Sequence, residues 1–78
     1  MMRIGELAGR SGLLIDTIRF YEKRGLFGAQ QVGRSSNGYR SYSDETVERV
    51  ALIRQAQGAG FSLSEIVELF GLWDKAQL

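Results

Sequence analysis

Glycine residues divide this 78-residue chain into short segments, and the segments between them carry the spacing of amphipathic helices. Residues 4–11 place apolar side chains three and four positions apart before Gly12, and residues 14–24 do the same before Gly25. Glycine just past the last periodic residue is a common helix stop, because it adopts the left-handed conformation without strain. Two short helices joined by a turn of three or four residues match the helix-turn-helix pattern.

Residues 26–42 differ in character, because glycine, serine and glutamine replace the periodic apolar residues. The dipeptide Asn37–Gly38 is the strongest short signal for the turn of a β-hairpin. Residues 29–33 and 39–42 flank that turn as candidate strands. A hairpin that follows a helix-turn-helix makes a winged-helix arrangement, so we expect this hairpin to be the wing.

A third helix is predicted to begin after Ser43, which is a favourable N-cap, with acidic residues in its first turn. It should end at Gly58 and Gly60. Its apolar face is expected to comprise Val47, Val50, Ala51, Leu52 and Ile53, with Arg49 and Arg54 on the polar side.

A fourth helix is predicted to begin at the sequence SLSE, residues 62–65, which has the form of a capping box. Its apolar stripe is expected to comprise Leu63, Ile66, Val67 and Phe70, and the helix is expected to stop at Gly71. The predicted fold is therefore mainly α with a small β-hairpin, a winged helix-turn-helix of four helices plus a wing in one small domain.

Composition argues against several classes of function. The chain has no cysteine and no histidine, which removes the commonest metal ligands and the commonest general base. We therefore expect no catalysis, no metal and no cofactor. No apolar run approaches the length of a membrane span, and the first residues lack the apolar stretch of a signal peptide. A cytoplasmic protein without a membrane partner is the expectation.

The charges are unevenly distributed along the chain, although the net charge is only +1. Residues 1–42 carry seven basic and three acidic groups, while residues 43–78 carry three basic and six acidic groups. A basic half joined to an acidic half suggests a face that attracts polyanions, although an ordinary mixed surface fits the charges equally well.

The second helical segment is the candidate recognition helix, since in a helix-turn-helix this helix enters the major groove of DNA. Arg19 can bind guanine or a phosphate, and Thr17 can meet a thymine methyl. Tyr21 is close to them in sequence, but one of Phe20 and Tyr21 must face the core. The choice between core packing and DNA contact stays open for Tyr21.

The wing contains Tyr39, Arg40 and Tyr42, which are side-chain types that commonly contact phosphates. Alternation along a strand points Tyr39 and Arg40 to opposite faces and puts Tyr42 on the face of Arg40. We therefore expect one tyrosine to face the core. Arg40 is expected to contact phosphate or reach the groove, with Tyr39 as its more favourable aromatic neighbour.

The sequence resembles the MerR family of bacterial transcription regulators. The stretches RIGELAGRSGL, DTIRFYEKRGL and NGYRSYSDETVERVALIRQAQGAGFSLSEI follow the pattern of the family's DNA-binding domain in order and nearly in spacing. The resemblance covers essentially residues 2–71. It implies a recognition helix, two wings and contacts to promoter DNA. The implied DNA-contacting residues are Thr17, Arg19, Tyr21 and Lys23 in the recognition helix, Arg34, Tyr39, Arg40 and Tyr42 in the wing, and Arg54 and Ser62 at phosphates.

The resemblance also implies how such a domain acts. Family members typically dimerise through a helix that follows this domain, bind inverted repeats and distort the promoter so that RNA polymerase can engage it. Residues 1–71 are expected to form the DNA-binding domain. Residues 72–78 are expected to be a linker or the start of a truncated dimerisation helix, so the chain itself could be monomeric.

Three departures from the family pattern are visible. Leu14 stands where a hydroxyl N-cap is usual, residues 28–33 are longer than usual, and the chain ends at Leu78. Two alternatives to a regulator remain. One is an excisionase-like architectural protein that bends DNA without activating transcription. The other is a helical protein-interaction module that uses Leu72 and Trp73 as an apolar anchor.

Overall fold

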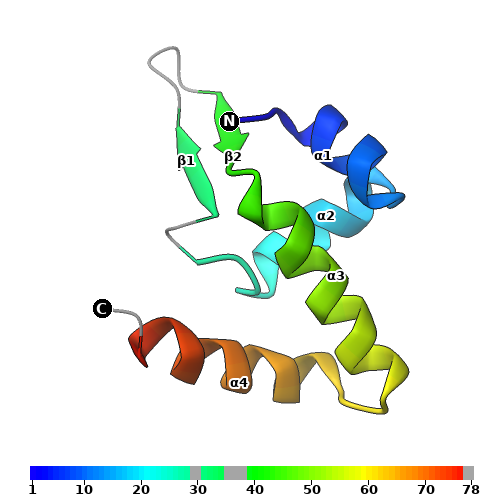
Figure 1. The fold of residues 1–78 in the computed structure, drawn as a ribbon, viewed down its shortest axis with the longest axis vertical. Helices are drawn as coiled ribbons and strands as arrows, with labels where there is room; N and C mark the ends of the chain where they lie inside the picture. Colours follow the sequence, from blue (N-terminus) through cyan, green and yellow to red (C-terminus); the bar gives the residue numbers. More distant parts are fainter. Residues whose placement is uncertain (29–30, 35–38, 77–78) are drawn as a thin grey trace.

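The computed structural model describes residues 1–28, 31–34 and 39–76, and it shows four helices and one antiparallel hairpin (Figure 1). The elements in chain order are α1 (Ile4–Ser11), α2 (Ile15–Lys23), β1 (Val32–Arg34), β2 (Arg40–Tyr42), α3 (Glu45–Gly58) and α4 (Leu63–Ala76). The predicted class is confirmed: the fold is a mainly α winged helix-turn-helix.

The turn between α1 and α2 forms as the glycine pattern predicts. Gly12 has a φ of 72° and its N–H donates to the carbonyl of Ala8 at 2.9 Å. Leu14 is the N-cap residue of α2 and makes no side-chain cap, as expected for an apolar residue at this position. The N-terminal amides of α2 therefore lack the side-chain acceptor that serine or aspartate would supply.

The end of α2 is a Schellman motif, which turns the chain into the core. Gly25 has a φ of 82°, its N–H donates to Glu22 at 3.0 Å, and the N–H of Leu26 donates to Tyr21 at 3.1 Å. This pairing satisfies the last carbonyls of the helix. Leu26, fully buried, follows directly and anchors the chain where it leaves α2.

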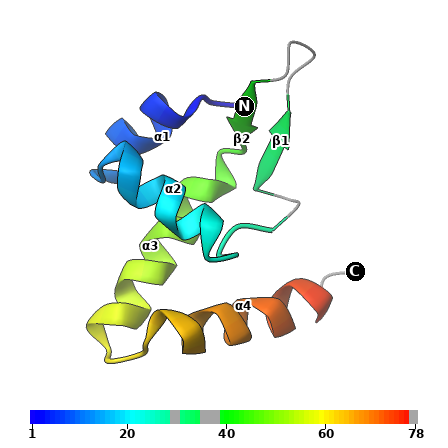
Figure 2. The same ribbon diagram turned by 180° about the vertical axis from the view of Figure 1, so that it is seen from behind.

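The wing is a short antiparallel hairpin that a third segment extends. Val32 pairs with Tyr42, and Arg34 pairs with Arg40. Met2 forms a bridge to Tyr42 through two hydrogen bonds of 2.7 Å, which brings the N-terminus beside β2 (Figure 2). The first predicted strand lies partly at residues 29–30 and the predicted turn at Asn37–Gly38, both outside the described residues.

Two hydrophobic clusters make up the core. The first joins α1, α2 and β2 and comprises Met2, Leu7, Ala8, Ile18 and Tyr42. The second joins α2, α3 and α4 and comprises Tyr21, Leu26, Val50, Ile53 and Ile66. Leu13 and Phe27 pack against both clusters. Helix α2 thus contributes one side chain to each cluster and is held from two sides.

The prediction that Ser43 caps α3 was wrong. The cap position is Asp44, which has helical dihedral angles and makes no side-chain cap. The hydroxyls of Ser43 and Thr46 lie 3.3 Å apart, and the hydroxyl of buried Thr46 donates to the carbonyl of Gln31 at 3.1 Å. The Thr46 hydroxyl therefore ties the start of α3 to the loop before β1, and neither hydroxyl caps the first amides of the helix.

The predicted faces of α3 were wrong at three positions: Ala51, expected on the apolar face, is exposed, and Leu52 and Arg49 are also misplaced. Leu52, expected in the core, is 48% exposed, whereas Arg49, expected on the polar face, is 8% exposed. The Nε of Arg49 donates to the Leu26 carbonyl at 2.8 Å, and its two terminal nitrogens donate to Asp74 at 3.0 and 2.9 Å. Its guanidinium also lies over the Phe70 ring, 4.1 Å from the centroid. These partners compensate the burial of its charge.

The start of α4 is predicted correctly and its end is not. The N–H of Ser62 donates to the Glu65 carboxylate at 2.9 Å, and the N–H of Glu65 donates to the Ser62 hydroxyl at 3.1 Å, so the capping box forms. The helix then passes through Gly71 and continues to Ala76. Continuation brings Asp74 to Arg49, an interaction that offsets the weak helix propensity of glycine. The expected boundary at residue 71 falls within α4.

Candidate nucleic-acid interface

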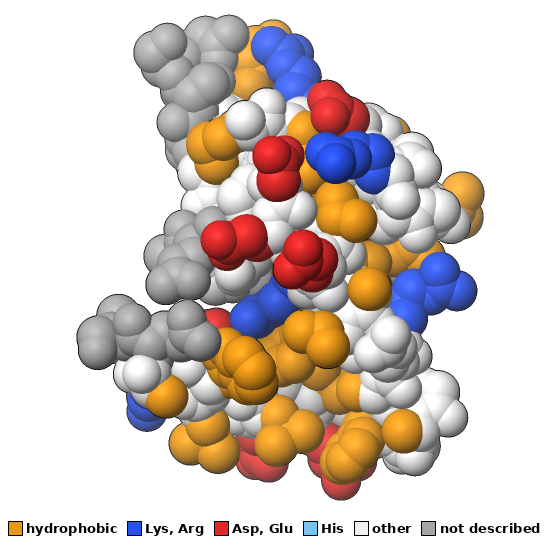
Figure 3. Space-filling view, in the orientation of Figure 1, with side chains coloured by type: hydrophobic (Ala, Val, Ile, Leu, Met, Phe, Trp, Pro, Cys, Tyr) orange, Lys and Arg blue, Asp and Glu red, His pale blue; other side chains and the backbone are white. Residues whose placement is uncertain are grey.

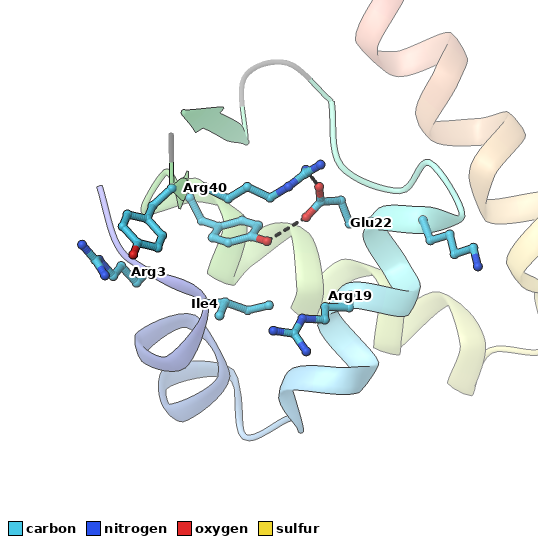
Figure 4. Close-up of a pocket in the computed structure, with 8 residues that line it drawn as sticks. Arg3, Ile4, Arg19, Glu22 and Arg40 are labelled. Atoms are coloured by element: carbon cyan, nitrogen blue, oxygen red, sulfur yellow. Dashed lines mark hydrogen bonds and ion pairs between the residues drawn. The ribbon is translucent and has the colours of Figure 1, made fainter. Parts of the chain in front are cut away.

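A concave site of about 630 Å³ lies between the recognition helix, the wing and the N-terminus (Figure 4). We call it the basic pocket, because four of its eight lining residues are cationic. Its lining residues are Arg3, Ile4, Arg19, Glu22, Lys23, Tyr39, Arg40 and Tyr42. Because three separate segments supply these side chains, the pocket exists only when the wing and the N-terminus pack against α2.

The recognition helix contributes one wall of the pocket. Arg19, Glu22 and Lys23 are three and four positions apart, so they share one face of α2. The side chain of Arg19 is 68% exposed and its nearest carboxylate, Asp16, is 3.8 Å away and more exposed still. An ion pair this exposed contributes little, so Arg19 is available to an incoming anion.

The wing contributes the opposite wall. Tyr42 is 1% exposed, its ring packs edge-on against Phe27, and its hydroxyl donates to Glu22 Oε1 at 2.7 Å. Arg40, two residues earlier on the same face of β2, forms an ion pair with Oε2 of the same carboxylate (Figure 4). Glu22 therefore links the recognition helix to the wing through both of its oxygens.

The N-terminus supplies a basic residue that the sequence reasoning missed. The bridge between Met2 and Tyr42 places Arg3 beside the wing, with its guanidinium 4.7 Å from the centroid of the Tyr39 ring. Tyr39 is 58% exposed, so this stacked pair is part of the surface. Nothing local in the sequence signals the contact, because it depends on the N-terminus pairing with a strand 40 residues away.

The predicted site residues do not all lie together. Arg19, Lys23, Tyr39 and Arg40 meet in the basic pocket with exposed side chains, and Thr17 is half-buried on α2 outside the pocket lining. Arg34 lies in β1, and its side chain is outside the described residues. Arg54 and Ser62 are exposed but lie elsewhere: Arg54 lines a second hollow of about 430 Å³ between α1 and α3, and Ser62 begins α4.

Two of the predicted contact residues are buried in the structure. Tyr21 is 5% exposed and its hydroxyl donates to Gln57 at 3.1 Å. Tyr42 is 1% exposed, with its hydroxyl engaged by Glu22. Both side chains therefore belong mainly to the core, and a DNA contact by either one stays a prediction. The expectation that one wing tyrosine faces the core is confirmed, and that tyrosine is Tyr42.

Burial of Tyr42 leads to a prediction about alkaline stability. Desolvation raises the pKa of Tyr42 above its ordinary value of 10.0, although the charges of Arg40 and Arg19 oppose the shift. A raised folded-state pKa stabilises the fold below the unfolded pKa, and this stability is lost as the pH rises through the folded value. Above about pH 10, Tyr42→Phe should therefore lose less stability with pH than the unmodified protein.

The measurement is the denaturant midpoint as a function of pH from neutral to strongly alkaline. Tyr39→Phe is the matched control, since it removes a hydroxyl from an exposed ring. The control should keep the alkaline loss of stability. Equal alkaline behaviour of Tyr42→Phe and the unmodified protein would contradict the assignment of that loss to Tyr42.

The described residues hold neither a cluster of metal ligands nor a helix suited to span a membrane. Among residues 1–28, 31–34 and 39–76 no group of three metal-ligating side chains lies together. In the same part of the chain no helix is long and apolar enough to cross a membrane.

The chain is a winged helix-turn-helix domain whose second helix and wing bring basic side chains to one site. The chain belongs to the MerR family, because the family model described as "MerR HTH family regulatory protein" matches residues 2–71.

Curated relatives agree with this assignment. The mercuric resistance operon regulatory protein of Bacillus cereus is 45% identical over 73 residues, which are 94% of this chain and 54% of that protein. The HTH-type transcriptional regulator CueR of Escherichia coli is 41% identical over 76 residues, which are 97% of this chain and 55% of that protein. The chain thus spans about half the length of the curated relatives it matches.

Solved structures of similar fold include two regulators. A lead(II)-bound transcription regulator from Ralstonia metallidurans has a TM-score of 0.85 and 37% identity, covering 100% of this chain and 59% of that one. HiNmlR, a MerR family regulator lacking the sensor domain and bound to promoter DNA, has a TM-score of 0.77 and 28% identity, covering 87% of this chain and 52% of that one.

Proposed function

We propose that this chain is the DNA-binding part of a MerR-type transcriptional regulator that acts on double-stranded promoter DNA and is not an enzyme. The observation that carries the proposal is the basic pocket, in which the recognition helix and the wing present cations side by side. A similar fold bound to promoter DNA supports it. The absence of cysteine and histidine from the sequence supports the non-enzymatic part.

The proposed division of labour follows from position and exposure. α2 enters the major groove, where Arg19 and Thr17 read base edges. Lys23, Arg40 and Arg3 neutralise phosphates beside it, contacts that fix register without reading sequence. Additional backbone contacts are proposed for Tyr39, Arg34, Arg54 and Ser62. At Ser62 the backbone N–H already donates to Glu65, so a phosphate there would have to use the next amides of α4.

We further propose that the whole regulator is a dimer that distorts its promoter, so that RNA polymerase engages it indirectly. Residues 1–71 would be the DNA-binding unit, and residues 72–78 would lead toward a dimerisation helix. Apolar side chains gather over α4 in Figure 3, and Leu72 and Trp73 are 68% and 60% exposed. An apolar surface at this end of the chain fits a helix that continues into a subunit contact.

The experiment that tests the proposal is selection of bound duplexes from a random DNA pool at two salt concentrations. Phosphate neutralisation predicts affinity that falls steeply with salt, and base reading predicts an enriched sequence that survives the higher salt. An enriched half-site would indicate monomeric binding, and an enriched inverted repeat would indicate a dimer.

Two outcomes would overturn the proposal as stated. Salt-sensitive binding without any enriched sequence would favour an architectural protein that recognises the backbone alone. No salt-sensitive binding to any duplex would remove DNA as the partner and favour a protein-interaction module that uses Leu72 and Trp73.

A further inference from the structure

Glu22 is an acidic residue in the middle of a site that otherwise attracts anions. It lies in the last turn of α2, where the helix dipole disfavours a negative charge. It also lines the basic pocket together with four cations, and a carboxylate there repels an approaching phosphate. A residue that opposes both the helix and the proposed ligand requires a further role to explain it.

The contacts of Glu22 indicate that role. Its side chain is only 18% exposed, and Oε1 accepts the hydroxyl of Tyr42 at 2.7 Å. Because the Tyr42 ring is buried and packs edge-on against Phe27, this hydroxyl is a fixed point of the core. The carboxylate is therefore held in one orientation, and its second oxygen is presented toward the wing.

Arg40 is the group that this second oxygen holds. Figure 4 shows the two side chains pointing toward one another across the pocket, and the ion pair joins Arg40 to Oε2. A guanidinium carries five N–H donors, so one carboxylate oxygen leaves donors for another anion. The Arg40 side chain remains 49% exposed. It is thus restrained by Glu22 while part of it stays open to solvent.

We propose that Glu22 is a positioning residue, which holds Arg40 of the wing in the orientation that receives a DNA phosphate beside the recognition helix. The inference rests on the proposed DNA-binding function. A long side chain that is already ordered loses less conformational entropy on binding than a mobile one. In this arrangement the advantage of a pre-oriented Arg40 exceeds the repulsion between the carboxylate and the DNA.

The proposal predicts that Glu22→Gln has opposite effects on DNA affinity in the presence and in the absence of Arg40. Glu22→Gln keeps an oxygen acceptor for Tyr42 but loses the ion pair, so it should weaken duplex binding roughly two- to tenfold, as expected when one long side chain is no longer held. In an Arg40→Ala background Glu22 has no arginine to position and only repels the DNA. There, Glu22→Gln should strengthen binding.

The experiment measures dissociation constants for the selected duplex and a random duplex with four proteins: unmodified, Glu22→Gln, Arg40→Ala and the double variant. Glu68→Gln is the matched control, because it makes the same charge change at an exposed position on α4. It should strengthen binding slightly in both backgrounds. A thermal melt of each protein confirms that the fold is retained.

A second variant tests the orientation of Glu22 without changing the charge of the pocket. Tyr42→Phe removes the anchor of Glu22 and leaves the net charge unchanged, so it should weaken binding in the same direction as Glu22→Gln. It also tests the proposal if Glu22→Gln does not fold.

The outcomes are distinct. Stronger binding by Glu22→Gln in both backgrounds would reduce Glu22 to a repulsive charge, and weaker binding in both would reduce it to a structural residue; either result overturns the proposal. If the unmodified protein showed no salt-dependent binding to either duplex, the proposed DNA-binding function itself would be overturned. The expected result, a change of sign in variants that melt like the unmodified protein, would establish the positioning role.

Discussion

Replacing Arg49 with alanine should lower the free energy of unfolding by about 3 kcal/mol, the upper end of the range for hydrogen bonds made by a charged group. The change would leave the Leu26 carbonyl without its donor and Asp74 without its ion-pair partner, and it would remove the cation stacked on Phe70. Small domains have only about 5–15 kcal/mol of stability, so this loss is a large share of it.

Denaturant unfolding followed by circular dichroism measures this effect. Arg54→Ala is the matched control, since Arg54 is an exposed arginine on the same helix, and it should change stability by no more than about 0.5 kcal/mol. Arg49→Lys should fall between the two, because lysine keeps the charge but lacks the planar fork that reaches both oxygens of Asp74. Equal stability of the two alanine variants would show that the contacts of Arg49 contribute nothing.

Replacing Arg19 with alanine should remove about 1–3 kcal/mol of discrimination between the selected duplex and a random one, the range for an arginine that reads a base. The expectation depends on the proposed function and on the exposure of Arg19 at the face of α2. Binding to the selected duplex should fall strongly, while binding to the random duplex should fall only by the loss of one positive charge.

Arg40→Ala is the control for Arg19→Ala, because it should remove a phosphate contact and not a base contact. A phosphate contact carries no sequence information, so this variant should bind the selected and random duplexes more weakly by a similar factor. Fluorescence anisotropy at fixed salt measures both variants on both duplexes. Equal losses on the two duplexes for Arg19→Ala would contradict base reading by that residue.

Much of the fold could be predicted because it rests on interactions within a few residues. Gly12 and Gly25 take the left-handed conformation that the helix stops require, and Ser62 and Glu65 form the reciprocal capping box. The alternation along residues 39–42 also predicted that one tyrosine would face the core. Each of these features depends on backbone geometry and near neighbours, which the order of residues specifies directly.

The wrong predictions concern residues whose structure depends on contacts that are distant in the sequence. Arg49 was placed on the polar side of its helix because its neutralising partner, Asp74, lies 25 residues away on another element. Gly71 was taken as a helix stop because its own propensity is low, and the contact that sustains the helix lies beyond it. Ser43 was predicted to cap α3, but its hydroxyl lies beside that of Thr46, which donates to the carbonyl of Gln31, 15 residues earlier in the chain.

The candidate site also combines features that local sequence predicts with features that depend on long-range packing. Composition and local periodicity are sufficient to predict which residues are cationic and which helix and strand carry Arg19, Lys23 and Arg40. Arg3 joins these residues, and Glu22 lies among them bonded to Tyr42, only through long-range packing that no local pattern specifies. The physical reason is that side chains from α2, β2 and the N-terminus become neighbours only when the two hydrophobic clusters close around the recognition helix.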